Sequence, residues 1–243
     1  MGGLRPCLPG KLSMEGKREI LLLWDIDGTI LSAEGAGPQA FERALWLQFG
    51  ERIRLSSIDW PGSTDFAIAY ALLENLGWEV TRKNARKLLD SYLEELPGML
   101  VSTRTKANPG VPELLEYFDR ESGVYQALLT GNLRRGSHLK LSHIGVEHYF
   151  LFGAYADHSD HRNDLGFHAL DLARERLGKD FSGEQVYVIG DTPKDIECGK
   201  QIGAHTVAVA TGHHSVKELG QHRPSVVLES LADPRGLRAF IGV

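Results

Sequence analysis

The chain of 243 residues contains only two cysteines, Cys7 and Cys198. Two cysteines cannot build a disulfide framework, and these two lack the spacing of a structural zinc site. The sequence also lacks any apolar run of the roughly 18 residues that a membrane-spanning helix needs. We therefore expect a protein of the reducing cytoplasm with no membrane partner.

An excess of basic charge is also absent. The chain has 27 basic and 32 acidic residues, which gives a formal net charge of −5. This balance offers no electrostatic basis for binding nucleic acid or an anionic membrane surface. We expect no nucleic-acid partner, and the sequence leaves a monomer and a homodimer both open.

The first residues are rich in glycine, proline and basic side chains, and they have no apolar segment like that of a signal peptide. We expect residues 1–16 to form a disordered N-terminal tail. Met14 is an alternative to Met1 as the true start.

Six short, β-rich apolar runs are continuous rather than alternating, which is typical of strands buried on both faces of a parallel sheet. The predicted strands are Ile20–Trp24, Val124–Leu129, Tyr149–Phe152, Val186–Ile189, Thr206–Ala210 and Val226–Leu228. The helical patterns between them are Val111–Phe118, Ser137–Ile144, Leu165–Leu177 and Pro193–Ile202. Strand and helix alternating in this way predict an α/β protein with a doubly wound parallel sheet.

One long segment interrupts this alternation. Between the first and second predicted strands, apolar residues recur at helical spacing over Pro38–Phe49, Phe66–Leu76 and Thr81–Leu96, and the last of these helices is predicted to stop at Pro97-Gly98. We therefore predict a smaller helical domain over residues 32–106, inserted into an α/β core domain of residues 17–31 and 107–243.

Ligands of open α/β sheets bind beyond the carboxyl ends of the strands. The first strand is followed there by Asp25-Ile26-Asp27-Gly28-Thr29. Aspartates at i and i+2 point the same way as they leave the strand, so one can attack phosphorus while the other gives a proton to the leaving oxygen. An ordinary Asp-Gly turn is the alternative.

Two later strands also end in polar turns. Thr130-Gly131-Asn132 offers a hydroxyl and backbone N–H groups to a phosphate, although the same residues also suit a plain turn. Asp191 ends a later strand and Asp195 lies four residues on, a pair that suits a hard cation with oxygen ligands. The alternative for this pair is a helix cap and a partner of the helix dipole.

The order and spacing of these three turns resemble the haloacid dehalogenase superfamily of aspartyl hydrolases, from about Glu19 to the C-terminus. The helical insertion lies where that family places its C1 cap. Leu129-Thr130-Gly131-Asn132-Leu133 and the cap stretch Gly62-Ser63-Thr64-Asp65 look most like the phosphoglycolate phosphatase-like branch.

The resemblance implies a role for each matched residue. Asp25 would be the nucleophile and a metal ligand, and Asp27 the general acid and base, with its main-chain carbonyl on the metal. Thr130, Gly131 and Asn132 would hold the phosphoryl oxygens. Asp191 and Asp195 would complete a Mg²⁺ site, because Mg²⁺ prefers a few carboxylates and keeps several waters.

The sequence departs from the family's pattern at one position. The family normally has a lysine between the second and the last motif, and residues 153–165 contain none. Arg162 lies where that lysine is expected, just before a predicted helix. Arginine binds carboxylate or phosphate in a fork, so Arg162 is our candidate for the lysine's role, and a surface position is the alternative.

Thr64 and Asp65 have two interpretations as well. They could face the substrate from the cap, or they could begin the helix Phe66–Leu76, since threonine is a good N-cap. Both can hold at once.

The predicted function is therefore Mg²⁺-dependent hydrolysis of a small phosphate ester, with 2-phosphoglycolate the first substrate that the resemblance names. A phosphomutase or another phosphotransferase of this superfamily remains an alternative. A ligand-binding pseudoenzyme is a third, because the usual lysine is missing. A dehalogenase and a phosphonatase are disfavoured, the first by Asp27 and Asp191 and the second by cap lysines that look solvent-facing.

Overall fold

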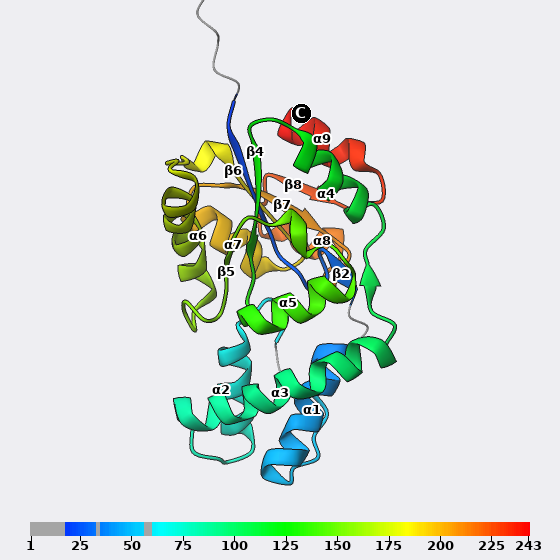
Figure 1. The fold of residues 1–243 in the computed structure, drawn as a ribbon, viewed down its shortest axis with the longest axis vertical. Helices are drawn as coiled ribbons and strands as arrows, with labels where there is room; N and C mark the ends of the chain where they lie inside the picture. Colours follow the sequence, from blue (N-terminus) through cyan, green and yellow to red (C-terminus); the bar gives the residue numbers. More distant parts are fainter. Residues whose placement is uncertain (1–17, 33–34, 56–59) are drawn as a thin grey trace, which may run out of the picture.

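The computed structural model describes residues 18–32, 35–55 and 60–243 (Figure 1). The tail predicted for residues 1–16 lies outside these residues. No helix in the described ranges is long and apolar enough to cross a membrane.

A six-stranded sheet forms the centre of the larger part of the molecule. Its strands are β1 (Ile20–Trp24), β4 (Val124–Leu129), β5 (Gly153–Ala154), β6 (Val186–Gly190), β7 (His205–Val209) and β8 (Val226–Leu228). They lie in the order β5-β4-β1-β6-β7-β8, and every pairing is parallel. This confirms the predicted doubly wound sheet, and it places β1 between β4 and β6, where the winding changes direction.

The first strand shows why the sequence folds in this way. All five residues of β1 are buried, and alternate side chains point to opposite faces of the sheet. Leu22 and Trp24 join one apolar cluster, and Leu21 and Leu23 join another. A continuous apolar run is thus required, because helices cover both faces.

Helices lie on both sides of the sheet (Figure 1). Residues of α4 (Val111–Arg120) and α9 (Pro234–Ile241) pack in the cluster of Trp24. Residues of α6 (Arg162–Leu177) and α7 (Pro193–Gln201) pack in the cluster of Leu23. The remaining helical segments of this part are α5 (Arg134–His143), α8 (Val216–Gln221) and the 3₁₀ turns Glu147–Tyr149 and Gly183–Gln185.

Three further helices form a separate layer beyond one edge of the sheet (Figure 1). They are α1 (Ala36–Phe49), α2 (Asp65–Asn75) and α3 (Arg82–Ser102), and their buried side chains form a third apolar cluster. The chain enters and leaves this layer through an antiparallel ribbon of β2 (Leu31–Ser32) and β3 (Lys106–Ala107). The ribbon joins residues 32–106 to the part of the molecule that contains the large sheet.

The prediction that the third helix stops at Pro97-Gly98 is wrong. Helix α3 continues through Pro97 to Ser102. A proline inside a helix costs about 3 kcal/mol, but Leu96 and Leu100 on either side are buried in the apolar cluster of the layer. Pro97 itself lies on the exposed face, so packing outweighs the local preference.

The predicted strand Tyr149–Phe152 is also wrong in its position. Glu147–Tyr149 forms a 3₁₀ turn, and the strand is Gly153–Ala154. Tyr149 and Phe150 pack against the core from outside the sheet, so their apolar character reflects burial without strand geometry. The short helices α8 and α9 were not predicted.

Candidate active site

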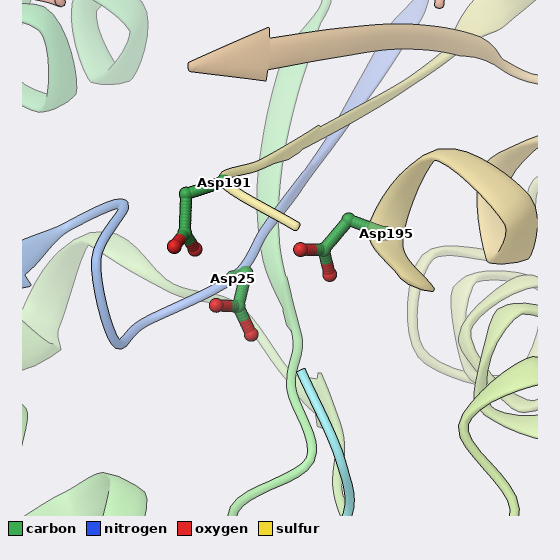
Figure 2. Close-up of side chains that lie close together, drawn as sticks. All are labelled: Asp25, Asp191 and Asp195. Carbon is green, nitrogen blue, oxygen red and sulfur yellow. The ribbon is translucent and has the colours of Figure 1, made fainter. Parts of the chain in front are cut away.

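The three polar turns lie side by side at the carboxyl ends of the strands, which we call the sheet edge. Asp25 follows β1, Thr130 follows β4, and Asp191 follows β6. Since the strands are parallel neighbours, their carboxyl ends lie together. Asp195 joins them from the first turn of α7, and Figure 2 shows the side chains of Asp25, Asp191 and Asp195 close together.

These three carboxyl groups, which we call the acidic cluster, are buried. Each offers an oxygen, and the three oxygens lie within 4.8 Å of one another. Burial, reinforced by the charge of Asp195, raises the pKa of Asp25 from 3.8 to about 7, although Arg162 opposes the shift. Burial and the charges of Asp25 and Asp195 raise the pKa of Asp191 well above its ordinary value. The cluster therefore has more negative charge than its surroundings neutralise.

Two glycines allow the main chain to approach Asp191. Gly28 has φ of 82°, and a Cβ added there would lie 2.3 Å from Asp191 Oδ2. A Cβ on Gly212 would lie 1.7 Å from the same oxygen. Thr29 Oγ1 donates to Asp191 Oδ1 at 3.2 Å, and Thr211 Oγ1 donates to the Gly28 carbonyl at 2.6 Å. The Asp-Gly-Thr sequence is thus needed to wrap the first turn around Asp191.

Asp195 is oriented by the start of α7. Its Oδ2 accepts from the Thr192 N–H at 3.0 Å and from Thr192 Oγ1 at 2.7 Å, which forms a capping box. The helix-cap interpretation considered for Asp191 and Asp195 therefore applies to Thr192 and Asp195. Capping leaves the other oxygen of Asp195 in the acidic cluster.

Arg162 lies in the site and is buried. It is the first residue of α6, which begins three residues earlier than the helix Leu165–Leu177 that we predicted. Its Nη2 donates to Asp25 Oδ1 at 3.0 Å, to the Leu129 carbonyl at 3.0 Å, and to Asp195 Oδ1. One guanidinium group thus links two members of the acidic cluster to the end of β4, and the surface position considered for Arg162 is wrong. Its role in place of the missing lysine stays a prediction.

Lys140 is a further charged residue of the site, and it was not predicted from the sequence. This residue of α5 is buried, and its Nζ donates to Asp27 Oδ2 at 2.6 Å and to Asn132 Oδ1 at 2.5 Å. The signal was present, because Lys140 lies three residues after Ser137 and four before Ile144, the ends of the helix that we predicted. Residues at this spacing share a helix face, but we looked for a cation only in residues 153–165.

The turn after β4 is held together by its own side chains. Asn132 Nδ2 donates to Asp27 Oδ2 at 2.7 Å and to Thr130 Oγ1 at 2.9 Å. A Cβ on Gly131 would lie 2.1 Å from the carbonyl oxygen of Ser63. The turn is therefore linked to Asp27 on one side and pressed against the helical layer on the other.

Thr64 and Asp65 lie at the start of α2, as one of the two interpretations expected. Thr64 caps α2, because its Oγ1 accepts from the Ala67 N–H at 3.1 Å. Asp65 reaches the turn after β4, where its Oδ2 accepts from the Leu133 N–H at 2.7 Å and its own N–H donates to the Gly131 carbonyl at 2.7 Å. Burial raises the pKa of Asp65 to about 6.

A cavity of about 260 Å³ lies between the sheet edge and the helical layer. Its inner wall contains Asp25, Asp27, Asn132, Lys140, Arg162 and Asp191, and Asp65 also lines it. Most of the residues predicted for catalysis and metal binding line this wall. The two exceptions are Asp195 and Thr130, and Thr130 accepts a hydrogen bond from Asn132 of the wall. Thr64 is turned away, since its Oγ1 donates to the Asp160 carbonyl at 2.6 Å.

Known proteins resemble this chain in sequence and in fold. Residues 166–234 match the HAD-hydrolase-like family model. The chain is 24% identical over 225 residues to "Probable phosphatase IndB" of Dickeya dadantii (strain 3937), which covers 89% of this chain and 92% of that protein.

Two solved structures share the fold. One is a hydrolase from Pseudomonas syringae, with a TM-score of 0.72 and 20% identity over 92% of this chain and 99% of that one. The other is a predicted phosphoglycolate phosphatase from Haemophilus somnus 129PT, with a TM-score of 0.70 and 17% identity over 91% and 99% of the two chains. The chain is therefore similar to haloacid dehalogenase-like hydrolases, and the relative that it matches over most of its length is named a probable phosphatase.

The acidic cluster predicts a pH dependence of stability in the absence of divalent cations. The pKa of Asp25 is raised in the folded protein from 3.8 to about 7, so the folded state holds this proton more tightly than the unfolded chain. The stability that this provides is complete below pH 3.8 and is lost as the pH rises to about 7. In chelator, the melting temperature of Asp25→Asn should therefore rise relative to that of wild type as the pH rises. The expected difference is about 2–4 °C for each kcal/mol of unfolding free energy that wild type loses.

Melting curves of both proteins across this pH range measure the difference. The exposed carboxylate of Asp119 on α4 is a matched control, and Asp119→Asn should follow wild type at every pH. A difference in melting temperature between Asp25→Asn and wild type that does not change with pH would contradict a raised pKa of Asp25.

Proposed function

We propose that this protein hydrolyses phosphate monoesters through a covalent phosphoryl group on Asp25. The observation that supports this most is the pairing of two distinct carboxylate environments at one wall of the cavity. Asp25 lies in the acidic cluster with Arg162, whereas Asp27 lies beside Lys140 and Asn132. Two carboxylates held in different environments suit a nucleophile and a proton carrier.

Asp25 has the features of the nucleophile. Its position at the end of β1 is fixed by its N–H, which donates to the Ile189 carbonyl at 2.9 Å. Arg162 holds Oδ1, and a guanidinium stays charged under all ordinary conditions. Arg162 can therefore orient the carboxylate before attack and carry charge near the phosphoryl group afterwards.

Asp27 has the features of the general acid and base. Its side chain is 34% exposed and borders the cavity, while Lys140 is only 3% exposed. Lys140 and Asn132 both bind Oδ2, which fixes the rotamer of the carboxyl group. In this position Asp27 could protonate the leaving oxygen and then accept a proton from the attacking water.

Thr130, Gly131 and Asn132 are the proposed phosphate-binding turn. Contacts with Asp27 and the helical layer fix the shape of the turn, and a turn of fixed shape can present N–H donors to phosphoryl oxygens without a cost of rearrangement. The link from Asp65 to Gly131 and Leu133 connects this turn to the helical layer. We accordingly propose that residues 32–106 act as a cap domain on the core.

The donor set of the acidic cluster fits Mg²⁺. The ion would be held by Asp25, Asp191, Asp195 and the main-chain carbonyl of Asp27. Mg²⁺ prefers oxygen ligands such as these carboxylates, and the cluster has too little positive charge around it without the ion. When bound, Mg²⁺ would neutralise the repulsion between a carboxylate nucleophile and a phosphate. Arg162 binds Asp195 as well as Asp25, so Asp195 would support the ion from a position shared with Arg162.

The substrate would be a small phosphorylated metabolite, because the cavity is enclosed between core and cap. The predicted phosphoglycolate phosphatase of the same fold makes 2-phosphoglycolate the first named compound to assay. The two cysteines in the sequence and the acidic net charge support a cytoplasmic protein without nucleic-acid or membrane partners, acting as a monomer or a homodimer.

The proposal predicts hydrolysis of 4-nitrophenyl phosphate with Mg²⁺ and none with chelator. Asp25→Asn should lower kcat by about 10³-fold or more, because it removes the nucleophile and leaves the fold intact. Steady-state assays of both proteins test this, with Asp119→Asn as the control. Turnover that persists in Asp25→Asn, or in chelator, would contradict the mechanism.

Lys140 gives a second prediction. Lys140→Met should lower kcat by about 10- to 100-fold with little change in KM, because Asp27 is then held by Asn132 alone. Lys140→Arg keeps a positive charge beside Asp27 and should recover part of the rate. Lys83→Met, on the exposed face of α3, is the control. An effect confined to KM would instead make Lys140 a substrate contact.

A further inference from the structure

The outer wall of the cavity is apolar. It is formed by Phe41 of α1, Leu55, Ile68 of α2 and Tyr92 of α3, all of them buried, together with Trp60 at the entrance. This wall and two members of the acidic cluster line the same cavity, so the part of a substrate beyond its phosphate would lie against the wall. The chemistry of this wall therefore selects the leaving group.

The positive charges in the described lining are already engaged. Lys140 donates to Asp27 and Asn132, and Arg162 donates to Asp25, Asp195 and the Leu129 carbonyl. The lining has four carboxyl groups, on Asp25, Asp27, Asp65 and Asp191, against these two cations. A divalent cation would bring the site close to neutrality, and the phosphate would then return it to negative charge.

Lys194 is not part of the lining, and its Nζ donates to the Pro61 carbonyl at 3.0 Å and to Ser63 Oγ at 2.7 Å. A second anionic group placed on the apolar wall would consequently lack a counter-charge. Its natural position is among Phe41, Ile68 and Tyr92, where desolvation of an unpaired carboxylate is costly. The only other ring that could become cationic in the described lining is that of His213, which is exposed and lies edge-on to Trp60 with 5.3 Å between the ring centres. The stretches 33–34 and 56–59 contain no lysine, arginine or histidine in the sequence.

We propose that the leaving group of the substrate is an uncharged apolar alcohol, aromatic or aliphatic, and that esters with a carboxylate or a second phosphate beyond the reacting phosphate are excluded. This rests on the proposed function, because it assumes that the phosphate binds at the acidic cluster. It makes 2-phosphoglycolate a poor substrate despite the likeness of fold, since its carboxylate would lie against the apolar wall.

The test compares two esters that differ in one charge. Benzyl phosphate and 4-carboxybenzyl phosphate are titrated by calorimetry into Asp25→Asn with Mg²⁺, and 2-phosphoglycolate is a third ligand. The neutral ester should bind at least about tenfold more tightly than either carboxylated one. The same ratio should appear in kcat/KM for the wild-type enzyme, because the leaving group occupies the same wall in both measurements.

A second arm reverses the preference. Ile68→Lys places a cation on the apolar wall, and it should lower the affinity for benzyl phosphate while raising that for 4-carboxybenzyl phosphate. Ile68→Met keeps the wall apolar and should retain the wild-type ratio. Melting curves test whether both variants fold. If Ile68→Lys does not fold, the ratio of affinities measured for the two esters without this substitution still tests the inference.

The outcomes separate this inference from the proposed function. Equal or tighter binding of the carboxylated esters would overturn the inference while leaving phosphatase activity intact. The predicted binding ratio without turnover by wild type would support the inference and remove the proposed reaction. Failure of every ester to bind would overturn both.

Discussion

The structure of the site depends on the cost of bringing three buried carboxyl groups together. Asp25, Asp191 and Asp195 offer oxygens within 4.8 Å of one another in a place that water does not screen. Repulsion of this kind is tolerated only when positive charge is supplied nearby. Arg162 supplies part of this positive charge, because it donates to Asp25 and Asp195. We propose a divalent cation because the guanidinium alone does not balance three carboxylates.

The surrounding elements keep the carboxyl groups in place against that repulsion. Parallel pairing aligns the ends of β1 and β6, Gly28 and Gly212 leave room for Asp191, and the capping box of α7 orients Asp195. On the other side of the cavity wall, Lys140 and Asn132 hold Asp27 away from the acidic cluster. One sheet edge thus contains two carboxylate environments, and the proposed chemistry needs both of them.

Much of this arrangement was predictable from the sequence because strand ends are local signals. The apolar run before Asp25 defines β1, and parallel neighbours then bring Thr130 and Asp191 to the same edge. The helical spacing placed Lys140 on one face with Ser137 and Ile144, but its partner Asp27 is 113 residues away in sequence, so the local pattern could indicate the face of Lys140 and not its contact. The continuation of α3 through Pro97 depends on packing within the helical layer, which propensities do not contain. The apolar cavity wall is likewise built from three helices whose relative placement is a tertiary property.

The most direct test of this account is a calorimetric titration of the resting protein with Mg²⁺ near neutral pH, beside Asp191→Asn. The account predicts saturable binding by wild type with release of protons, because the raised pKa of Asp25, about 7, leaves part of the acidic cluster protonated until the ion binds. Binding should be lost in Asp191→Asn. Wild type that binds no Mg²⁺, or Asp191→Asn that binds it equally well, would contradict the claim that the acidic cluster is a divalent-cation site.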